Sequence, residues 1–260
     1  MTYFAHTDFY NYYLKEIKKN NKQTNQEKIL KKMFKELMNI SKNDLIIPTY
    51  NFDFVKTKKF NFKKDRSYVG SFSEMFRNKF KKNRTLTPMF STCGSISKIN
   101  FYKNNYFDPF GKHSEFNYLV KKKGKILNFG AEFAPSFIMF IERSIKYGAL
   151  YRYGKVFIGK TFKKGKYTKC KLYFEVRPKQ INIEYDLKKL KKNLLRLKIM
   201  KIKKTSNNFT YEEIDAKQFL NFGLKNLKKN PYFFLKKNTI NELKKKKLFH
   251  FKKFKIKEFE

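Results

Sequence analysis

The stretch KILNFGAEFAPSFIMFIERSIKYGALYRYGKVFIGK, residues 125–160, predicts a strand, a loop and a helix that follow one another directly. Its apolar segment 126–129 is typical of a buried strand and stops at Gly130. After a loop, Ser136 is placed to cap a helix whose apolar run is 137–141. Because α/β proteins place ligands and catalytic groups where a strand is followed by a loop and a helix N-terminus, we expect functional residues here.

The pattern continues on both sides of this stretch and predicts one large α/β domain with strands 45–48 and 126–129 buried. Residues 24–38 carry an apolar stripe that is typical of an amphipathic helix. Alternating helices and strands predict a three-layer α/β/α fold with a mixed central sheet. Further candidate elements are a strand at 168–178, helices at 186–199 and 216–230, and a hairpin at 206–214. We expect this domain to span residues 1–235 and a basic extension, disordered on its own, to span residues 236–260.

The charge of the chain is extreme. Its 260 residues include 62 Lys and Arg against 21 Asp and Glu, which gives a net charge of +41. One explanation is base composition, because Lys, Asn, Phe, Ile and Tyr have A/T-rich codons. The other is a polyanionic partner, because so much like charge on one domain repels itself unless counter-charge is supplied. The sequence leaves both explanations open.

Cysteine, histidine and hydropathy patterns exclude several kinds of site. Cys93 and Cys170 lack the spacing of a redox or metal motif, which is typical of a reduced compartment. His6, His113 and His250 are scattered, so we expect no metal site, and we expect His113 to be a surface loop residue. We expect no membrane span, because no apolar run reaches the roughly 20 residues that one needs. We also expect no targeting segment at the first residues.

Seven short motifs carry a resemblance to a known family. They are YFAHTD at 3–8, PTY at 48–50, SYVGSFSEMFR at 67–77, RTLTPMFS at 84–91, DPFGKHS at 108–114, SFIMFIE at 136–142 and YRYGKVFIG at 151–159. In this order they resemble the motifs of the aminoglycoside 3-N-acetyltransferase family, which transfers acetyl from acetyl-CoA to amino sugars. The resemblance covers about residues 3–235. It implies that family's fold, which differs from the more widespread N-acetyltransferase fold.

One position in the central stretch departs from the family's pattern, and Thr87, where the family often has His or Asn, is a milder departure elsewhere. Where the family has Thr-aromatic-x-His-aromatic-x-Glu, with His as general base, this chain has Met139 at the His position. A methionine has no proton to exchange near neutral pH and packs well in a core. Glu142 is retained three residues further along the same helix face, and we expect it to pair with Arg152 or Lys155. We therefore assign no catalytic residue from the sequence.

The resemblance also implies a set of residues around acetyl-CoA, the family's acetyl donor. The matching positions are Pro48, Thr49, Arg84, Pro88, Ser91, Tyr151 and Arg152. These residues would bind acetyl-CoA in an active protein and would be vestigial in an inactive one.

Two functions follow from these observations. The main hypothesis is a catalytically inactive acetyltransferase-fold protein in a ribosome, most naturally a mitochondrial one in the matrix, which binds ribosomal RNA and neighbouring ribosomal proteins and uses no cofactor. Its support is Met139, the net charge of +41 and the basic extension. The alternative is an active acetyl-CoA-dependent N-acetyltransferase for amino sugars or aminoglycosides in a bacterial cytoplasm.

The RNA hypothesis assigns phosphate contacts to lysines, because Lys is a flexible point charge suited to neutralising a nucleic-acid backbone. These lysines fall in a loop at 55–64, at the end of a helix near 121, and in the extension. They are Lys56, Lys58, Lys59, Lys63, Lys64, Lys121, Lys122, Lys123, Lys244, Lys245, Lys246, Lys247, Lys252 and Lys253. We expect the phenylalanines between them to stack on unpaired bases or to bury against neighbouring proteins.

Overall fold

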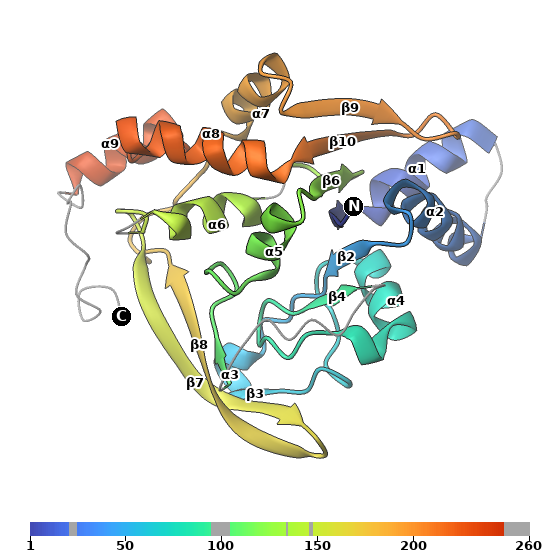
Figure 1. Cartoon of the computed structure of the whole chain (residues 1–260), viewed down its shortest axis with the longest axis horizontal. Coiled ribbons are helices and arrows are strands. Elements are labelled where there is room, and N and C mark those ends of the chain that lie inside the picture. Colours follow the sequence, from blue (N-terminus) through green and yellow to red (C-terminus); the bar gives the residue numbers. More distant parts are fainter. Residues whose placement is uncertain (21–24, 95–104, 134, 146–147, 247–260) are drawn as a thin grey trace.

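A six-stranded mixed sheet lies at the centre of the fold, in the order β4-β2-β1-β6-β10-β9 (Figure 1). The computed structural model describes residues 1–20, 25–94, 105–133, 135–145 and 148–246. Strands β1, β2 and β6 are parallel, whereas β4, β10 and β9 pair antiparallel with their neighbours. The six strands are β1 (Tyr3–Thr7), β2 (Leu45–Pro48), β4 (Thr92–Gly94), β6 (Lys125–Phe129), β9 (Met200–Lys204) and β10 (Thr210–Asp215).

Helices cover both faces of this sheet, which confirms the predicted three-layer arrangement. Because side chains alternate across a strand, Phe4 and Ala5 belong to different hydrophobic cores, as do Ile126 and Leu127. The core of Ala5 and Leu127 receives side chains from α1 (Phe9–Asn20), α2 (Gln26–Ser41) and α4 (Ser71–Lys79). The core of Phe4 and Ile126 receives side chains from α5 (Glu115–Lys121), α6 (Ser136–Ser144), α7 (Leu187–Arg196) and α8 (Ala216–Lys229).

The two strands predicted as buried, β2 and β6, are buried in the structure. Strand β6 ends at Gly130 for a steric reason. The φ angle of Gly130 is +76°, and a Cβ there would lie 2.6 Å from the Asp8 carbonyl oxygen. Gly130 also forms a bridge with Thr7, so the ends of β1 and β6 lie together where the chain turns towards α6.

A second sheet, of which the sequence predicted only the strand at 168–178, has the strand order β3-β7-β8-β5. Strands β7 (Tyr153–Lys163) and β8 (Lys166–Val176) form a long hairpin at the lower left of Figure 1. The two-residue strands β3 (Lys59–Phe60) and β5 (Tyr106–Phe107) pair with its edges in parallel. The loop predicted at 55–64 is therefore wrong: α3 (Phe54–Thr57) and β3 form there, because Phe54 and Phe60 are fully buried.

Two boundaries differ from the sequence prediction. The hairpin predicted at 206–214 begins at Met200, because α7 ends at Arg196 and leaves room for β9. The extension begins with the helix α9 (Lys237–Lys245), whose Leu243 is fully buried, so this part packs on the domain. Residues 247–260 lie outside the described residues. In the described part of the chain, none of the helices is long and apolar enough to cross a membrane.

Candidate functional site

Glu142 lies at the centre of a buried hydrogen-bond network between α6 and the start of β7. Its carboxylate accepts hydrogen bonds from the Tyr151 hydroxyl, from Arg152 Nε at 2.9 Å and from the Tyr185 hydroxyl at 2.8 Å. Arg152 also donates through Nη2 to the Tyr185 oxygen at 2.6 Å. Glu142 and Tyr151 are 0% exposed and Arg152 is 4% exposed. The ion pair predicted between Glu142 and Arg152 is therefore confirmed.

The charges in this network hold each other in place. Burial alone would lower the pKa of Arg152, but the Glu142 carboxylate raises it, so that this pKa lies above its ordinary value. Burial and the Glu142 carboxylate also raise the pKa of Tyr151 and of Tyr185, so both hydroxyls stay protonated and donate. Both oxygens of Glu142 are thus committed to hydrogen bonds within the protein.

Met139 lies about one helical turn before Glu142 and faces a cavity that is too small for a substrate. This cavity has a volume of about 10 Å³, and Asp108, Arg152 and Glu175 also line it. Met139 packs against the same hydrophobic core as α6. The position at which the resemblance implies a general base thus holds an apolar side chain with no room for an acceptor.

A second buried cluster joins three of the residues expected around acetyl-CoA. Arg84 Nε donates to Ser91 Oγ at 3.0 Å and to Thr49 Oγ1 at 3.2 Å, and Arg84 Nη2 donates to the Thr49 carbonyl oxygen at 2.8 Å. Arg84 Nη1 donates to the carbonyl oxygens of Phe62 and Asp65. Burial lowers the pKa of Arg84 to about 10. The guanidinium group therefore fastens the segment after β3 to the end of β2.

The residues expected around acetyl-CoA thus occupy two separate buried clusters. Pro48 and Pro88 are buried on the segments that carry Thr49 and Ser91, whereas Tyr151 and Arg152 belong to the Glu142 network. The polar groups of each cluster form hydrogen bonds with other groups of the protein. These hydrogen bonds stabilise the end of β2 and the start of β7. A role for these residues in binding acetyl-CoA stays a prediction.

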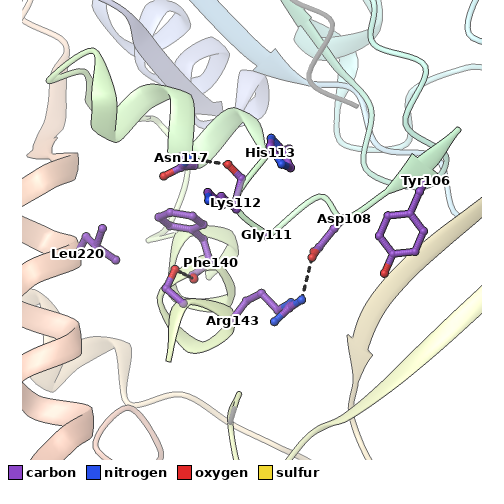
Figure 2. Close-up of a pocket in the computed structure, with 10 residues that line it drawn as sticks. Tyr106, Asp108, Gly111, Lys112, His113, Asn117, Phe140, Arg143 and Leu220 are labelled. Atoms are coloured by element: carbon purple, nitrogen blue, oxygen red, sulfur yellow. Dashed lines mark hydrogen bonds and ion pairs between the residues drawn. The ribbon is translucent and has the colours of Figure 1, made fainter. Parts of the chain in front are cut away.

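A larger cavity, of about 570 Å³, opens beside α5, α6 and the segment after β5 (Figure 2). Its titratable groups belong to Tyr106, Asp108, Lys112, His113 and Arg143. His113 is exposed, as predicted for a surface loop residue, but it also lines this cavity. The other lining residues are Gly111, Asn117, Phe140, Ser144 and Leu220. A carboxylate, an imidazole and several hydroxyl and amide groups on an apolar wall suit a small polar ligand.

Asp108 and Arg143 form an ion pair in the wall of this cavity, with 3.0 Å between Asp108 Oδ2 and Arg143 Nη2 (Figure 2). Burial raises the pKa of Asp108 by more than the charges of Arg143 and His113 lower it. Arg143 Nε is buried without a hydrogen-bond partner among the described residues. The described part of the wall therefore lacks an acceptor for this N–H group, and an unsatisfied buried donor destabilises a protein.

Ser136 does not cap α6, contrary to the sequence prediction. The N-cap is Pro135, Ser136 is the first helical residue, and the Ser136 hydroxyl lies 2.9 Å from His6 Nε2. Both side chains are buried. Burial lowers the pKa of His6 to about 4, so its imidazole is neutral at neutral pH. This contact joins β1 to α6.

The burial of His6 is expected to make stability depend on pH. His6 takes up a proton near pH 6.5 in the unfolded chain but only near 4 in the folded protein, so stability is complete above 6.5 and falls as the pH drops towards 4. Between pH 7 and pH 5 this loss is about 2 kcal/mol. Urea unfolding of the wild type and of His6→Gln at these two pH values measures it. On acidification His6→Gln should lose about 2 kcal/mol less stability than the wild type. The control His113→Asn should lose as much stability as the wild type does. Equal losses in all three proteins would contradict the prediction.

The lysines assigned to RNA do not form one surface. All those in the described part of the chain are exposed. The group at 56–64 lies around α3 and β3, whereas α9, which ends near the group at 244–246, lies well apart from them (Figure 1). Lys121 to Lys123 lie in a third place, at the end of α5. Lys247, Lys252 and Lys253 lie outside the described residues.

Two parts of the site give no signal in the sequence. Tyr185, which completes the Glu142 network, comes from the irregular segment before α7. Asp108 belongs to a recognisable motif, but its partner Arg143 is 35 residues away and has no such marker. Within the described ranges, the structure places no group of three or more His, Cys, Asp or Glu where it could hold a metal ion.

Comparison with solved structures shows the fold. The chain is similar to AAC-IIIb in a binary complex with CoASH, with a TM-score of 0.64 at 14% identity, over 88% of this chain and 90% of that one. It is similar to the YokD protein from Bacillus subtilis, with a TM-score of 0.63 at 14% identity, over 88% and 93%. It is also similar to a mutant of the aminoglycoside acetyltransferase AAC(3)-IVa in complex with a gentamicin, with a TM-score of 0.61 at 14% identity, over 92% and 86%.

At these identities the likeness concerns the fold alone. The fold that the sequence motifs implied, that of the aminoglycoside 3-N-acetyltransferases, is therefore confirmed. No protein-family model matches the chain, and no curated protein sequence matches it.

Proposed function

We propose that the chain is an acetyl-CoA-dependent N-acetyltransferase that acts on an amino sugar in the cavity lined by Asp108 and His113. The observation that carries the proposal is this cavity of about 570 Å³, which has a carboxylate and an imidazole in its wall. The shared fold supports it, because similar structures include a protein bound to CoASH and an aminoglycoside acetyltransferase bound to a gentamicin.

His113 takes the role that Met139 cannot take. In the reaction the ammonium group first loses one proton to water. The amine nitrogen then attacks the carbonyl carbon of the thioester, the C–N bond forms, and the C–S bond breaks. A second proton of the amine passes to His113 and then to the departing thiolate, so acetyl-CoA leaves as CoA with a free thiol. Histidine suits this step because an imidazole exchanges protons close to neutral pH.

Asp108 and Arg143 bind the acceptor rather than move its proton. The Asp108 carboxylate attracts the ammonium form of an amino sugar, and its ion pair with Arg143 fixes its position. Tyr106, Ser144 and Asn117 offer hydrogen bonds to sugar hydroxyls from the same cavity. Acetyl-CoA is the second substrate, and its contacts in this chain stay a prediction.

Thiol release from acetyl-CoA in the presence of amino sugars tests the proposal. We expect the native protein to release thiol at a rate that depends on the acceptor. Met139→His restores the family's pattern, but we expect no gain from it, because the cavity at Met139 has a volume of only about 10 Å³. A folded native protein without acceptor-dependent thiol release would overturn the proposal. Turnover by Met139→His alone would contradict the role of His113.

A second candidate function keeps the fold without the chemistry: a structural protein that binds ribosomal RNA in a mitochondrial ribosome. The observation that favours it is Met139 at the base position, together with the net charge of +41. This candidate implies the mitochondrial matrix, whereas acetyl transfer fits a bacterial cytoplasm, and both locations stay predictions. It expects no turnover in the assay above, and sedimentation with ribosomal particles at low salt.

A further inference from the structure

The second sheet carries a row of three lysines across its outward face. Lys59 on β3, Lys160 on β7 and Lys169 on β8 are register partners of one another in neighbouring strands. All three are exposed, whereas the next residues on two of these strands, Phe60 and Thr161, are fully buried and face the core. Because side chains alternate across a strand, the three lysines point away from the protein together.

This row is destabilising in the isolated protein. Adjacent strands lie about 4.8 Å apart, and like charges directly opposite each other repel. Some lysines elsewhere have acidic partners: Lys125 pairs with Asp215 at 2.7 Å. Over the described residues, no acidic side chain forms an ion pair with Lys59, Lys160 or Lys169. An anionic partner would remove this repulsion.

Exposed rings and an exposed aliphatic side chain lie among these cations. In the neighbouring row, Lys171 on β8 has Ile158 on one side and Tyr106 on the other. Ile158 is 64% exposed, Tyr106 is 44% exposed and Tyr167 is 43% exposed. Lys59 Nζ lies 6.0 Å from the centre of the Tyr167 ring. The face therefore offers both positive charge and flat apolar surface.

We propose that this face of β3, β7, β8 and β5 binds single-stranded RNA. The lysine row neutralises backbone phosphates, and the two exposed tyrosine rings stack on unpaired bases, which a duplex does not offer. The hairpin lies at the edge of the molecule, where an extended strand can lie along it (Figure 1). This inference does not rest on acetyl transfer, and it would give the second candidate function a contact surface.

Fluorescence anisotropy with a labelled oligouridine over a series of salt concentrations tests the proposal. The sheet variant, Lys160→Gln/Lys169→Gln/Lys171→Gln, replaces two lysines of the row and one of the neighbouring row. The control, Lys217→Gln/Lys225→Gln/Lys228→Gln, removes three exposed lysines of α8 and changes the net charge equally. We expect the sheet variant to reduce the slope of log affinity against log salt by about 2, because each phosphate contact contributes about 0.7. The α8 control should keep the slope of the wild type.

The variant Tyr167→Ala separates base stacking from charge. We expect it to weaken binding roughly tenfold without changing the salt slope. Equal losses in both triple variants, or no effect of Tyr167→Ala, would overturn the proposal, because the lysines would then act through net charge alone. The same variants are tested with anionic vesicles and with heparin. The proposal would also be overturned if the sheet variant lost as much affinity for either of these polyanions as for oligouridine while Tyr167→Ala had no effect. Displacement of the oligouridine by equimolar CoA would assign the face to the acetyl donor instead. Circular dichroism checks that each variant is folded.

Discussion

Glu142→Gln is expected to lower the free energy of unfolding by about 3–5 kcal/mol, because it leaves the Arg152 charge buried without its counter-ion. Arg152 is only 4% exposed, so water cannot replace the lost carboxylate. The substitution keeps the size of the side chain, so the loss reports on charge and hydrogen bonds rather than on a cavity. Urea unfolding of the two proteins at neutral pH measures the difference.

Two controls show whether the loss belongs to the buried network. Glu184→Gln removes an exposed ion pair with Lys236, and we expect little change in stability from it. The double variant Glu142→Leu/Arg152→Met removes both buried charges, and we expect it to be more stable than Glu142→Gln. If Glu142→Gln were as stable as the wild type, the network would not hold α6 against the start of β7.

The central layers of the fold could be predicted because their sequence patterns are local. The residues of β2 and β6 form short apolar runs, and the stripe of α2 has a helical period, so each segment shows its structure without its neighbours. The end of β6 could also be predicted, since Gly130 occupies a backbone position that a side chain would block. The helix boundaries then follow within a few residues.

Of the second sheet only β8 could be predicted, as the strand expected at 168–178, because the rest of the sheet has almost no local pattern. Strands β3 and β5 have two residues each, which is too short for any periodicity to show. They become strands only because the β7–β8 hairpin gives them hydrogen-bond partners. Lys59, Lys160 and Lys169 become neighbours only when these strands pair. The sequence therefore shows the three lysines but not that they form a row.

The candidate site was predictable only in part, for the same reason. The pair of Glu142 and Arg152 could be predicted, because both residues lie in motifs of the central stretch. The cavity could not, since Asp108 and Arg143 meet through the fold. His113 carried no signal beyond its loop, and only its place in the cavity wall makes it a candidate base.

His113→Ala is expected to lower kcat/KM for acetyl transfer by about 10²–10⁴-fold, because a positioned general base contributes that much to the rate. The loss should appear mainly in kcat, since His113 acts on the proton of the reacting amine rather than on the sugar ring. Asp108→Asn should instead raise KM for the acceptor, because it removes the charge that attracts the ammonium group. Steady-state kinetics with one amino sugar separates the two effects.

Chemical rescue distinguishes a base from a residue that only shapes the cavity. Added imidazole should restore part of the rate of His113→Ala, because it can enter the space that the side chain leaves and accept the proton of the amine. Lys121→Ala, an exposed change at the end of α5, should keep the rate of the wild type and should not respond to imidazole. A His113→Ala protein with the wild-type rate, or one whose rate added imidazole leaves unchanged, would exclude His113 as the base.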